Sequence, residues 1–259
     1  MLMFKRLIGP ALAALFALSA PVVAQAPEAS PAERQRIEAI VREYLLRNPE
    51  ILQEALVELE KRQAQAEDRA RAAAFAANRD ALYRSPNQIV LGNPQGDVTL
   101  VEFFDYNCGF CKRALPEMME LLRSDSRLRV VLKDFPVLGP GSIEAANVAV
   151  ALKMQLAAPK YLEFHQKLLG SRGQANGARA LEVAREIGAD MTRLQRDMQS
   201  PQVQATLAEN MRLAEMLRIN GTPTYVVGEE VVVGAVGLEK LRENLARARV
   251  ACAAQPNMC

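Results

Sequence analysis

Residues 98–111 read VTLVEFFDYNCGFC, and this stretch decides both the fold and the chemistry of the chain. Residues 98–104 form an apolar, β-rich run, and residues 109–123 carry apolar side chains at helical spacing. The sequence therefore predicts a strand that leads into a helix. Cys108 lies where the strand gives way to the helix, and Cys111 lies one helical turn further on.

This position gives the two cysteines different chemistry. Free backbone N–H groups and the positive end of the helix dipole favour a thiolate at Cys108, and Lys112 and Arg113 add positive charge. We expect Cys108 to be the accessible nucleophile, and Cys111 to be more buried and to resolve the mixed disulfide. A permanent structural disulfide and half of a thiolate metal site are the alternatives, although neither uses the position at the start of a helix.

The overall composition excludes several classes of protein. Of the 259 residues, 50% are hydrophobic and 24% are charged, and 32 Lys and Arg against 30 Asp and Glu leave a formal charge of +2. This balance excludes a disordered chain, a collagen-like fibre and a nucleic-acid binder that works by bulk positive charge. His165 is the single histidine, so a histidine-rich metal site is excluded and we expect His165 to be a packed or surface residue. No metal and no cofactor are predicted.

The first residues have the pattern of an export signal. Lys5 and Arg6 precede an apolar stretch, residues 7–20, which is shorter than the ~20 residues that span a bilayer. We expect a signal peptide at residues 1–24 and a periplasmic protein, with an uncleaved anchor as the alternative. Disulfides form and persist in that compartment, so paired cysteines are read first as disulfide chemistry.

An N-terminal helical arm and linker are predicted at residues 25–85, before a catalytic domain at residues 86–259. Residues 32–78 are rich in strong helix formers, with Asn48 as the expected N-cap of a second helix and Pro49 at its first position. A short helical pair has an apolar face but encloses no core of its own. We therefore predict self-association through the arm; packing of the pair on the main domain is the alternative.

The catalytic domain has a mixed order of elements, which predicts an α/β fold. After the first strand and helix, the sequence indicates a strand at 128–132, a helical insert at about 142–218, a hairpin at 224–227 and 231–233, and a final helix at 238–250.

Residues 98–111, the Gly-Thr-Pro-Thr at 221–224 and this order of elements resemble the thioredoxin-fold, DsbA-like periplasmic thiol–disulfide oxidoreductases. With the arm included, the chain is most similar to the ScsC-like group (suppressor of copper sensitivity), whose N-terminal helices can trimerise. The resemblance implies a thioredoxin fold with a helical insert, preceded by a helical arm. The implied partners are unfolded or wrongly disulfide-bonded exported proteins, a membrane redox partner that resets the cysteines, and further copies of the chain in a homo-oligomer, but no nucleic acid.

The resemblance also implies roles for individual residues. Cys108 matches the attacking cysteine, Cys111 the resolving one, and Glu102 the acidic residue on the strand. Burial of Glu102 in its apolar run would fit it to exchange a proton with Cys111, but an exposed strand face explains it as simply. Lys133 could pair with Glu102, although a solvated lysine is the better default.

Four residues are expected to contact the substrate chain. Thr222 and Pro223 match a loop with a cis peptide bond beside the active cysteines, and an ordinary trans turn is the alternative. Gly109 and Phe110 stand between the cysteines and resemble the Gly-Tyr pair of the oligomeric isomerases. We therefore favour an isomerase or reductase over an oxidase.

Cys252 and Cys259 enclose a short loop and are predicted to form a structural disulfide, with an accessory redox pair as the alternative. A rival function of another class is a module in which the thiolates of Cys108 and Cys111 bind Cu(I) rather than exchange disulfides.

Overall fold

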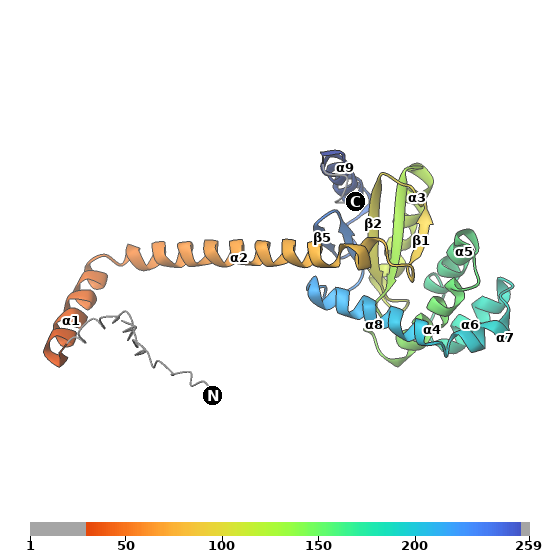
Figure 1. Ribbon diagram of the computed structural model, residues 1–259, viewed down its shortest axis with the longest axis horizontal. Coiled ribbons are helices and arrows are strands. Elements are labelled where there is room, and N and C mark those ends of the chain that lie inside the picture. Colours follow the sequence, from red (N-terminus) through yellow and green to blue (C-terminus); the bar gives the residue numbers. More distant parts are fainter. Residues whose placement is uncertain (1–29, 255–259) are drawn as a thin grey trace, which may run out of the picture. The chain divides into compact units, whose positions relative to one another are not determined.

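The computed structural model describes residues 30–254. The chain divides into two compact units, with the boundary between Arg62 and Gln63. Helix α1 (Pro31–Arg47) and the first part of α2 (Glu50–Tyr83) form the first unit (Figure 1). The predicted signal peptide, residues 1–24, lies outside the described residues. No helix between residues 30 and 254 is long and apolar enough to cross a membrane.

The first unit has caps at both ends of α1. Ser30 and Glu33 form a capping box at its start. Asn48 terminates α1, and its side-chain amide donates to the Tyr44 carbonyl oxygen at 2.9 Å. The prediction that Asn48 caps the start of the second helix is therefore wrong, because its side chain satisfies a carbonyl of the preceding helix instead.

The second unit contains a five-stranded sheet in the order β1-β3-β2-β4-β5. Strands β2 and β3 are parallel, and the other neighbouring pairs are antiparallel. The strands are β1 (Ile89–Gly92), β2 (Val98–Phe104), β3 (Leu128–Asp134), β4 (Thr224–Val227) and β5 (Glu230–Val233). The predicted strand at residues 98–104 is confirmed, and β1 is an additional strand that the sequence analysis did not predict.

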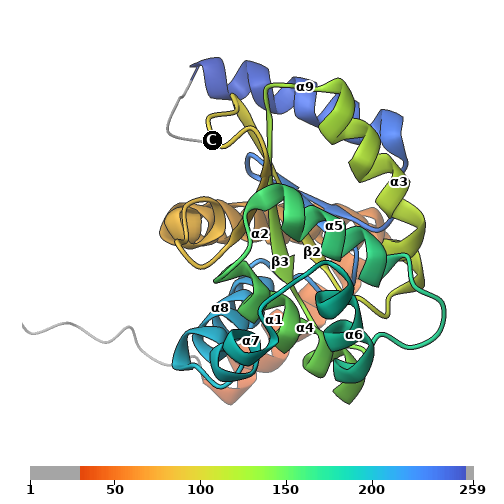
Figure 2. The ribbon, with the colours of Figure 1, turned by 90° about the vertical axis from the view of Figure 1, so that its right-hand side faces the viewer.

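Helices cover both faces of this sheet, which gives the thioredoxin-like α/β fold predicted from the sequence. Figure 2 shows α3 and α9 side by side, and the helices of the insert lie around α4. The helices are α3 (Gly109–Ser124), α4 (Pro140–Lys153), α5 (Ala158–Leu169), α6 (Gly177–Glu186), α7 (Met191–Asp197), α8 (Pro201–Met216) and α9 (Leu238–Ala254).

The side chains of β2 alternate between two hydrophobic clusters, one on each face of the sheet. Leu100 and Phe104 join the larger cluster with α3 and the insert, whereas Val101 and Phe103 join the cluster on the opposite face. Glu102 is two residues from both Leu100 and Phe104, so its side chain points to the same face of the sheet, which α3 covers.

The C-terminal end of α2 belongs to the second unit. Phe75, Leu82 and Tyr83 are buried in the cluster on the face opposite α3. This end of the helix covers part of the sheet, whereas the sequence analysis expected a linker that extends to residue 85. The contacts that anchor it are supplied by distant parts of the chain, which the composition of the segment does not reveal.

Lys133 is buried beneath this end of α2. Its ammonium donates to the Ala81 carbonyl oxygen at 2.7 Å and forms an ion pair with Glu209 at 3.5 Å. Burial lowers the pKa of Lys133 to about 8. Both expectations for Lys133 are wrong: it is not solvated, and it does not pair with Glu102, because neighbouring positions of β2 and β3 alternate between the two faces of the sheet.

Candidate functional site

Cys108 is the N-cap residue of α3, with extended backbone angles (φ −72°, ψ 116°). Its N–H donates to the Asp105 carbonyl oxygen and its own carbonyl accepts from the Lys112 N–H, both at 3.0 Å. The Sγ donates to the Thr222 carbonyl oxygen at 3.1 Å. The sulfur therefore lies at the N-terminus of a helix, beside the loop that precedes β4.

Cys108 and Cys111 are free thiols that differ in burial. Cys108 is 6% exposed and Cys111 is 0% exposed. The expected order of burial is confirmed, but Cys108 is itself buried, so the structure does not show the accessible nucleophile that was expected. Burial first, and then the nearby Glu102 carboxylate, raise the pKa of Cys111 well above its ordinary value, so Cys111 holds its proton.

Glu102 is buried within β2, whose seven residues are all buried. Burial, and to a smaller extent the charge of Glu117, raise the pKa of Glu102 to about 8. The alternative of an exposed strand face is therefore wrong. Because Glu102 contributes to the raised pKa of Cys111, the two groups are electrostatically coupled on the face of the sheet that α3 covers.

The peptide bond between Thr222 and Pro223 is cis, as expected. The loop has further hydrogen bonds on either side of this bond. The Thr224 hydroxyl donates to the Gly221 carbonyl oxygen at 2.8 Å, and the Gly234 N–H donates to the Pro223 carbonyl oxygen at 2.8 Å. These bonds fix the loop and direct the Thr222 carbonyl oxygen towards the Cys108 sulfur.

Asp105 connects the loop before Cys108 to the start of the insert, and the sequence analysis did not identify it. Its carboxylate accepts four hydrogen bonds between 2.7 and 3.0 Å, from the backbone N–H groups of Asn107, Val137 and Leu138 and from the Ser142 hydroxyl. The sequence did contain a signal for this role, because Asp105 follows a strand and stands two residues before Asn107. Aspartate side chains in turns commonly accept backbone N–H groups two residues further on.

Phe110, one of the predicted substrate-contacting residues, is 57% exposed. The Arg113 guanidinium carbon lies 4.3 Å from the centroid of its ring. Three other large apolar side chains are also exposed beside the loop that Asp105 holds. We refer to these four exposed residues, Phe110, Val137, Leu138 and Ile143, as the active-site apolar patch.

The remaining candidate residues lie elsewhere. His165 is buried, with its Nδ1 3.3 Å from the Tyr106 hydroxyl and its ring against Phe104, so the packed reading is confirmed. Burial lowers the pKa of His165 to about 4. Cys252 is buried, but Cys259 lies outside the described residues, so their pairing stays a prediction. Residues 30–254 contain no cluster of three or more His, Cys, Asp or Glu side chains that could hold a metal ion.

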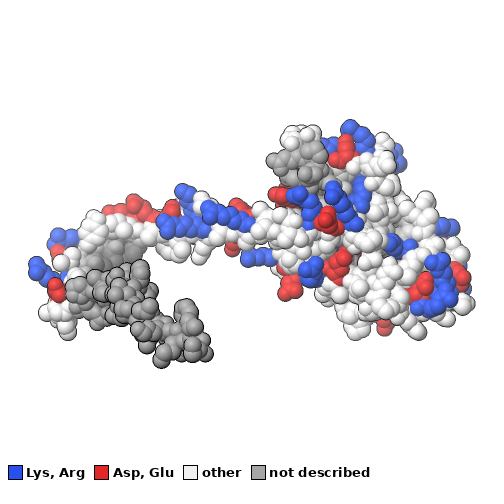
Figure 3. All heavy atoms as spheres, in the orientation of Figure 1, with Lys and Arg blue, Asp and Glu red and all other residues white. Residues whose placement is uncertain are grey.

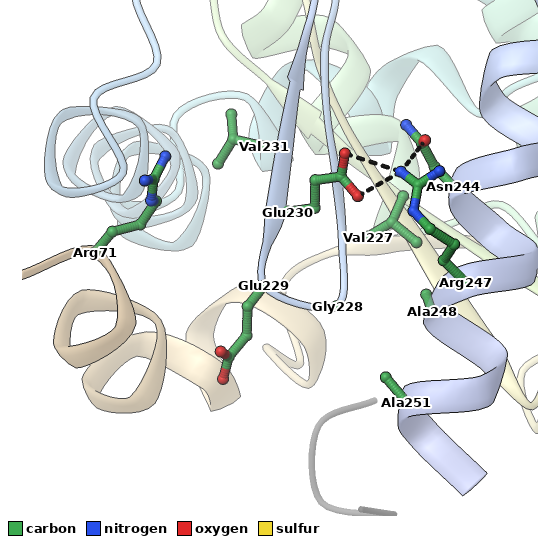
Figure 4. A pocket seen from close by; sticks show the side chains of 10 residues that line it. All are labelled: Arg71, Val227, Gly228, Glu229, Glu230, Val231, Asn244, Arg247, Ala248 and Ala251. Carbon is green, nitrogen blue, oxygen red and sulfur yellow. Dashed lines mark hydrogen bonds and ion pairs between the residues drawn. The ribbon is translucent and has the colours of Figure 1, made fainter. Parts of the chain in front are cut away.

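A surface pocket at the turn between β4 and β5 contains none of the predicted site residues (Figure 4). Arg247 of α9 binds Glu230 of β5 and Asn244 of its own helix, while Arg71 of α2 lies on the opposite side of the turn. Basic and acidic side chains are interspersed over the visible face of the molecule (Figure 3), as the nearly balanced charge predicts. The chemistry therefore centres on the cysteines rather than on this pocket.

Comparisons with known proteins agree with this geometry. Residues 99–246 match the family described as DSBA-like thioredoxin domain, and residues 33–66 match the copper resistance protein ScsC N-terminal domain. A thioredoxin-like oxidoreductase from Silicibacter pomeroyi is 47% identical, with a TM-score of 0.63, over 67% of this chain and 98% of that one. A linker-deletion mutant of Proteus mirabilis ScsC is 25% identical, with a TM-score of 0.64, over 88% of this chain and 100% of that one.

Two further similarities bear on location and length. A periplasmic thioredoxin-like protein from Salmonella enterica serovar Typhimurium is 25% identical, with a TM-score of 0.59, over 66% of this chain and 95% of that one. The chain spans 23% of the length of the curated relatives it matches, such as a Na(+)/H(+) antiporter NhaA from Salinispora arenicola, which is 29% identical over 154 residues and 59% of this chain. The family match covers more than half of the chain and includes both cysteines. This protein belongs to the DSBA-like thioredoxin domain family, with an ScsC-type N-terminal segment and a Cys-x-x-Cys pair at Cys108 and Cys111.

Proposed function

We propose that the chain catalyses thiol–disulfide exchange on exported proteins in the periplasm, as a disulfide isomerase or reductase. The observation that carries this proposal is the asymmetry of the cysteine pair. Cys108 is a free thiol at the start of α3, against the Thr222 carbonyl oxygen, while Cys111 is fully buried with a raised pKa. Such a pair has one sulfur for attack and one for resolution.

The reaction begins when the Cys108 thiolate attacks one sulfur of a substrate disulfide. A bond forms between Cys108 and that sulfur, the substrate S–S bond breaks, and the other substrate sulfur leaves as a thiolate. In isomerisation that thiolate, or another substrate thiolate, attacks the mixed disulfide and restores Cys108. In reduction Cys111 loses its proton and attacks Cys108, which leaves a Cys108–Cys111 disulfide and a substrate with two thiols.

Glu102 is the residue we assign to proton transfer at Cys111. Attack by Cys111 requires loss of its proton, and burial makes the free anion costly. With its pKa raised to about 8, the Glu102 carboxylate is a stronger base than an exposed glutamate, so it can accept the proton of Cys111. This pKa is also close enough to neutral pH for Glu102 to release that proton afterwards. The electrostatic coupling between Glu102 and Cys111 supports this role.

The active-site apolar patch supports an unfolded protein as the substrate. Val137 and Leu138 follow each other next to the loop before Cys108, since their N–H groups bind the Asp105 carboxylate and the Cys108 N–H binds the Asp105 carbonyl oxygen. An unfolded chain exposes apolar side chains that such a surface can cover. In this proposal Thr222 and Pro223 position the substrate backbone, and Gly109 and Phe110 contact it next to the attacking sulfur.

The preference for an isomerase or reductase rests on two features. The Gly-Phe pair between the cysteines, with Thr222 before Pro223, resembles the isomerases more than the strong oxidase DsbA. The N-terminal segment supports a homo-oligomer, since it matches the ScsC N-terminal domain and its helix α1 has no buried residue. Several catalytic domains in one assembly would hold a misfolded substrate through repeated encounters.

Reactivation of scrambled ribonuclease tests the proposal. The reduced protein should restore ribonuclease activity, and Cys108→Ser should abolish this; equal rescue by Cys108→Ser would contradict the proposal. Oxidation of reduced ribonuclease by the disulfide form, with no rescue of the scrambled enzyme, would favour an oxidase instead. Stoichiometric Cu(I) binding without exchange would favour the copper-binding alternative.

A further inference from the structure

Two basic side chains that follow Cys108 on α3, and a third on the loop that one of them binds, form no ion pair within the described residues. Across the second unit most surface Arg and Lys residues form ion pairs, such as Arg123 with Glu120 and Lys167 with Glu186. Lys112, Arg113 and Arg172 form none within residues 30–254: Lys112 donates to carbonyl oxygens and Arg113 lies over an aromatic ring. We define these three residues as the cationic rim.

Arg113 folds back towards the start of α3. Its guanidinium carbon lies 4.3 Å from the centroid of the Phe110 ring. Its Nη1 lies 3.8 Å from the position that a Cβ atom at Gly109 would occupy. The exposed guanidinium therefore lies beside the two residues that follow Cys108.

Lys112 and Arg172 extend the positive charge to the loop between α5 and α6. The Lys112 ammonium donates to the Ser171 carbonyl oxygen at 3.0 Å and to the Gly173 carbonyl oxygen at 3.2 Å. The exposed Arg172 lies between these two residues. The same loop is bound to the residue before Cys108, because the Ala175 N–H donates to the Asn107 side chain at 2.7 Å. The loop that carries Arg172 is therefore bound both to Lys112 and to Asn107, the residues on either side of the start of α3.

The carboxylates nearest to Cys108 in the sequence do not neutralise the rim. Asp105 and Glu102 are buried, and Asp105 already accepts four hydrogen bonds. The first turn of α3 contains no acidic residue. On the insert, Glu144 binds the Gly177 N–H at 3.0 Å and no rim residue. The exposed charged side chains in the first turn of α3 and on the loop that Lys112 binds are therefore basic, in a protein whose total charge is nearly balanced.

We infer that the cationic rim selects protein substrates that carry acidic side chains beside the reactive cysteine. The inference rests on the proposed exchange reaction and adds a substrate preference to it. An acidic side chain one or two residues from the substrate sulfur would lie next to Arg113 or Arg172 while that sulfur meets Cys108. Exposed charge pairs of this kind chiefly raise the rate of encounter and respond to salt.

The test uses three peptides, each closed by one disulfide, that differ only in the residues flanking the cysteines: Asp, Ser or Lys. The reduced protein converts each peptide disulfide to two thiols and becomes the Cys108–Cys111 disulfide, with two electrons passing to the peptide. Second-order rates are measured by acid quenching and chromatography. At low salt the Asp peptide should react about fivefold faster than the Ser peptide and the Lys peptide more slowly, and the differences should shrink in 0.5 M NaCl.

Variants then assign the preference to the rim. In the double variant Arg113→Gln, Arg172→Gln the ratio of the Asp rate to the Ser rate should fall below twofold. The matched control is Arg212→Gln, an exposed arginine on the C-terminal half of α8 whose described contact is the Met216 sulfur. That control should keep the wild-type ratio. A change in the reactivity of Cys108 itself would alter all three rates alike and would cancel in the ratio.

The outcomes separate this inference from the proposed function. Equal rates for the three peptides with the wild-type protein, or an unchanged ratio in the double variant, would overturn the inference and leave the exchange reaction intact. Failure to reduce any of the peptides would count against the exchange reaction. The single variants Arg113→Gln and Arg172→Gln, each with an expected partial loss of the ratio, replace the double variant should it not fold.

Discussion

The Cys108 sulfur lies 3.1 Å from the Thr222 carbonyl oxygen, although 114 positions separate the two residues. The contact exists because α3 follows β2 and the loop before Thr224 leads into β4, and these two strands pair in the sheet. The thiol uses this carbonyl as its hydrogen-bond acceptor. A substrate sulfur that approaches Cys108 must therefore approach beside the loop of Thr222 and Pro223. The same loop would then contact both the attacking sulfur and the substrate.

Replacement of Cys111 should trap substrates on Cys108. Cys111→Ser removes the sulfur that resolves the mixed disulfide, so adducts between Cys108 and the substrate should persist. They are measured as bands on non-reducing gels that disappear when dithiothreitol is added. Cys108→Ser is the matched control and should give no adducts, because Cys111 is fully buried and its raised pKa holds it as a thiol. Adducts of equal yield in both variants would show that the roles of the two cysteines are not distinct.

Loss of the Asp105 carboxylate should loosen the active-site loop. Asp105→Asn replaces an acceptor of four hydrogen bonds with an amide that cannot accept them all, and a buried network of this kind should lose about 2–4 kcal/mol of unfolding free energy. Urea denaturation measures this change, and the rate of ribonuclease rescue should fall with it.

Ser142→Ala is the milder control for Asp105, since it removes only the 2.7 Å hydrogen bond from the hydroxyl to Asp105 and the contact of that hydroxyl with Asn107. Its cost should be about 1 kcal/mol. A larger loss of stability in Ser142→Ala than in Asp105→Asn would contradict the central position of Asp105.

The stability of Glu102→Gln relative to wild type should depend on pH. The pKa of Glu102 is about 8 in the folded protein and near 4.5 when unfolded, so the folded protein binds an extra proton between these values. Wild-type stability is therefore lost as pH rises from about 4.5 to 8, and the loss is complete above 8. Glutamine does not ionise. Urea unfolding at pH 5, 7 and 9 should therefore show the free energy of unfolding of the variant rising relative to that of the wild type with each increase in pH.

The neighbouring groups do not disturb this comparison. Asp134 and Lys133 also have pKa values near 8, but both are present in the wild type and the variant, so they cancel in the difference. Glu120→Gln, at a surface residue paired with Arg123, supplies the control and should show no such trend. A difference between Glu102→Gln and wild type that is constant with pH would refute the raised pKa.

Local patterns predicted the elements that build the site, but long-range contacts determined the state of several side chains. The strand at residues 98–104 was predictable because an apolar run ends at a polar turn, and Cys108 follows from it. The burial of Lys133 was not predictable, because charged residues are seldom buried and its carbonyl partner, Ala81, lies 52 positions away. The four-residue strand β1 has too few side chains for a clear alternating pattern, and it is held by pairing with β3.

Removal of the residues up to Arg62 should give a monomer while leaving a folded catalytic unit. The apolar side chains of the first unit, including Ile37, Ile40, Val41, Tyr44, Leu52, Leu56 and Val57, are exposed in the single chain, and burial between copies would stabilise an oligomer. The deletion ends at Arg62, the last residue of the first unit, and so leaves Phe75 in the core of the second unit. Light scattering measures the mass of each form.

A substitution separates association from the effect of shortening the chain. Ile40→Glu places a charge on the exposed apolar face of α1 and should dissociate the full-length protein, whereas Arg36→Glu, also exposed on α1, changes charge without removing an apolar group and should leave the oligomer intact. If association is needed for isomerisation, Ile40→Glu should lose ribonuclease rescue and retain reduction of small peptide disulfides, since only a large misfolded substrate benefits from several catalytic domains in one assembly. Equal masses for the intact and shortened chains would contradict self-association through the first unit.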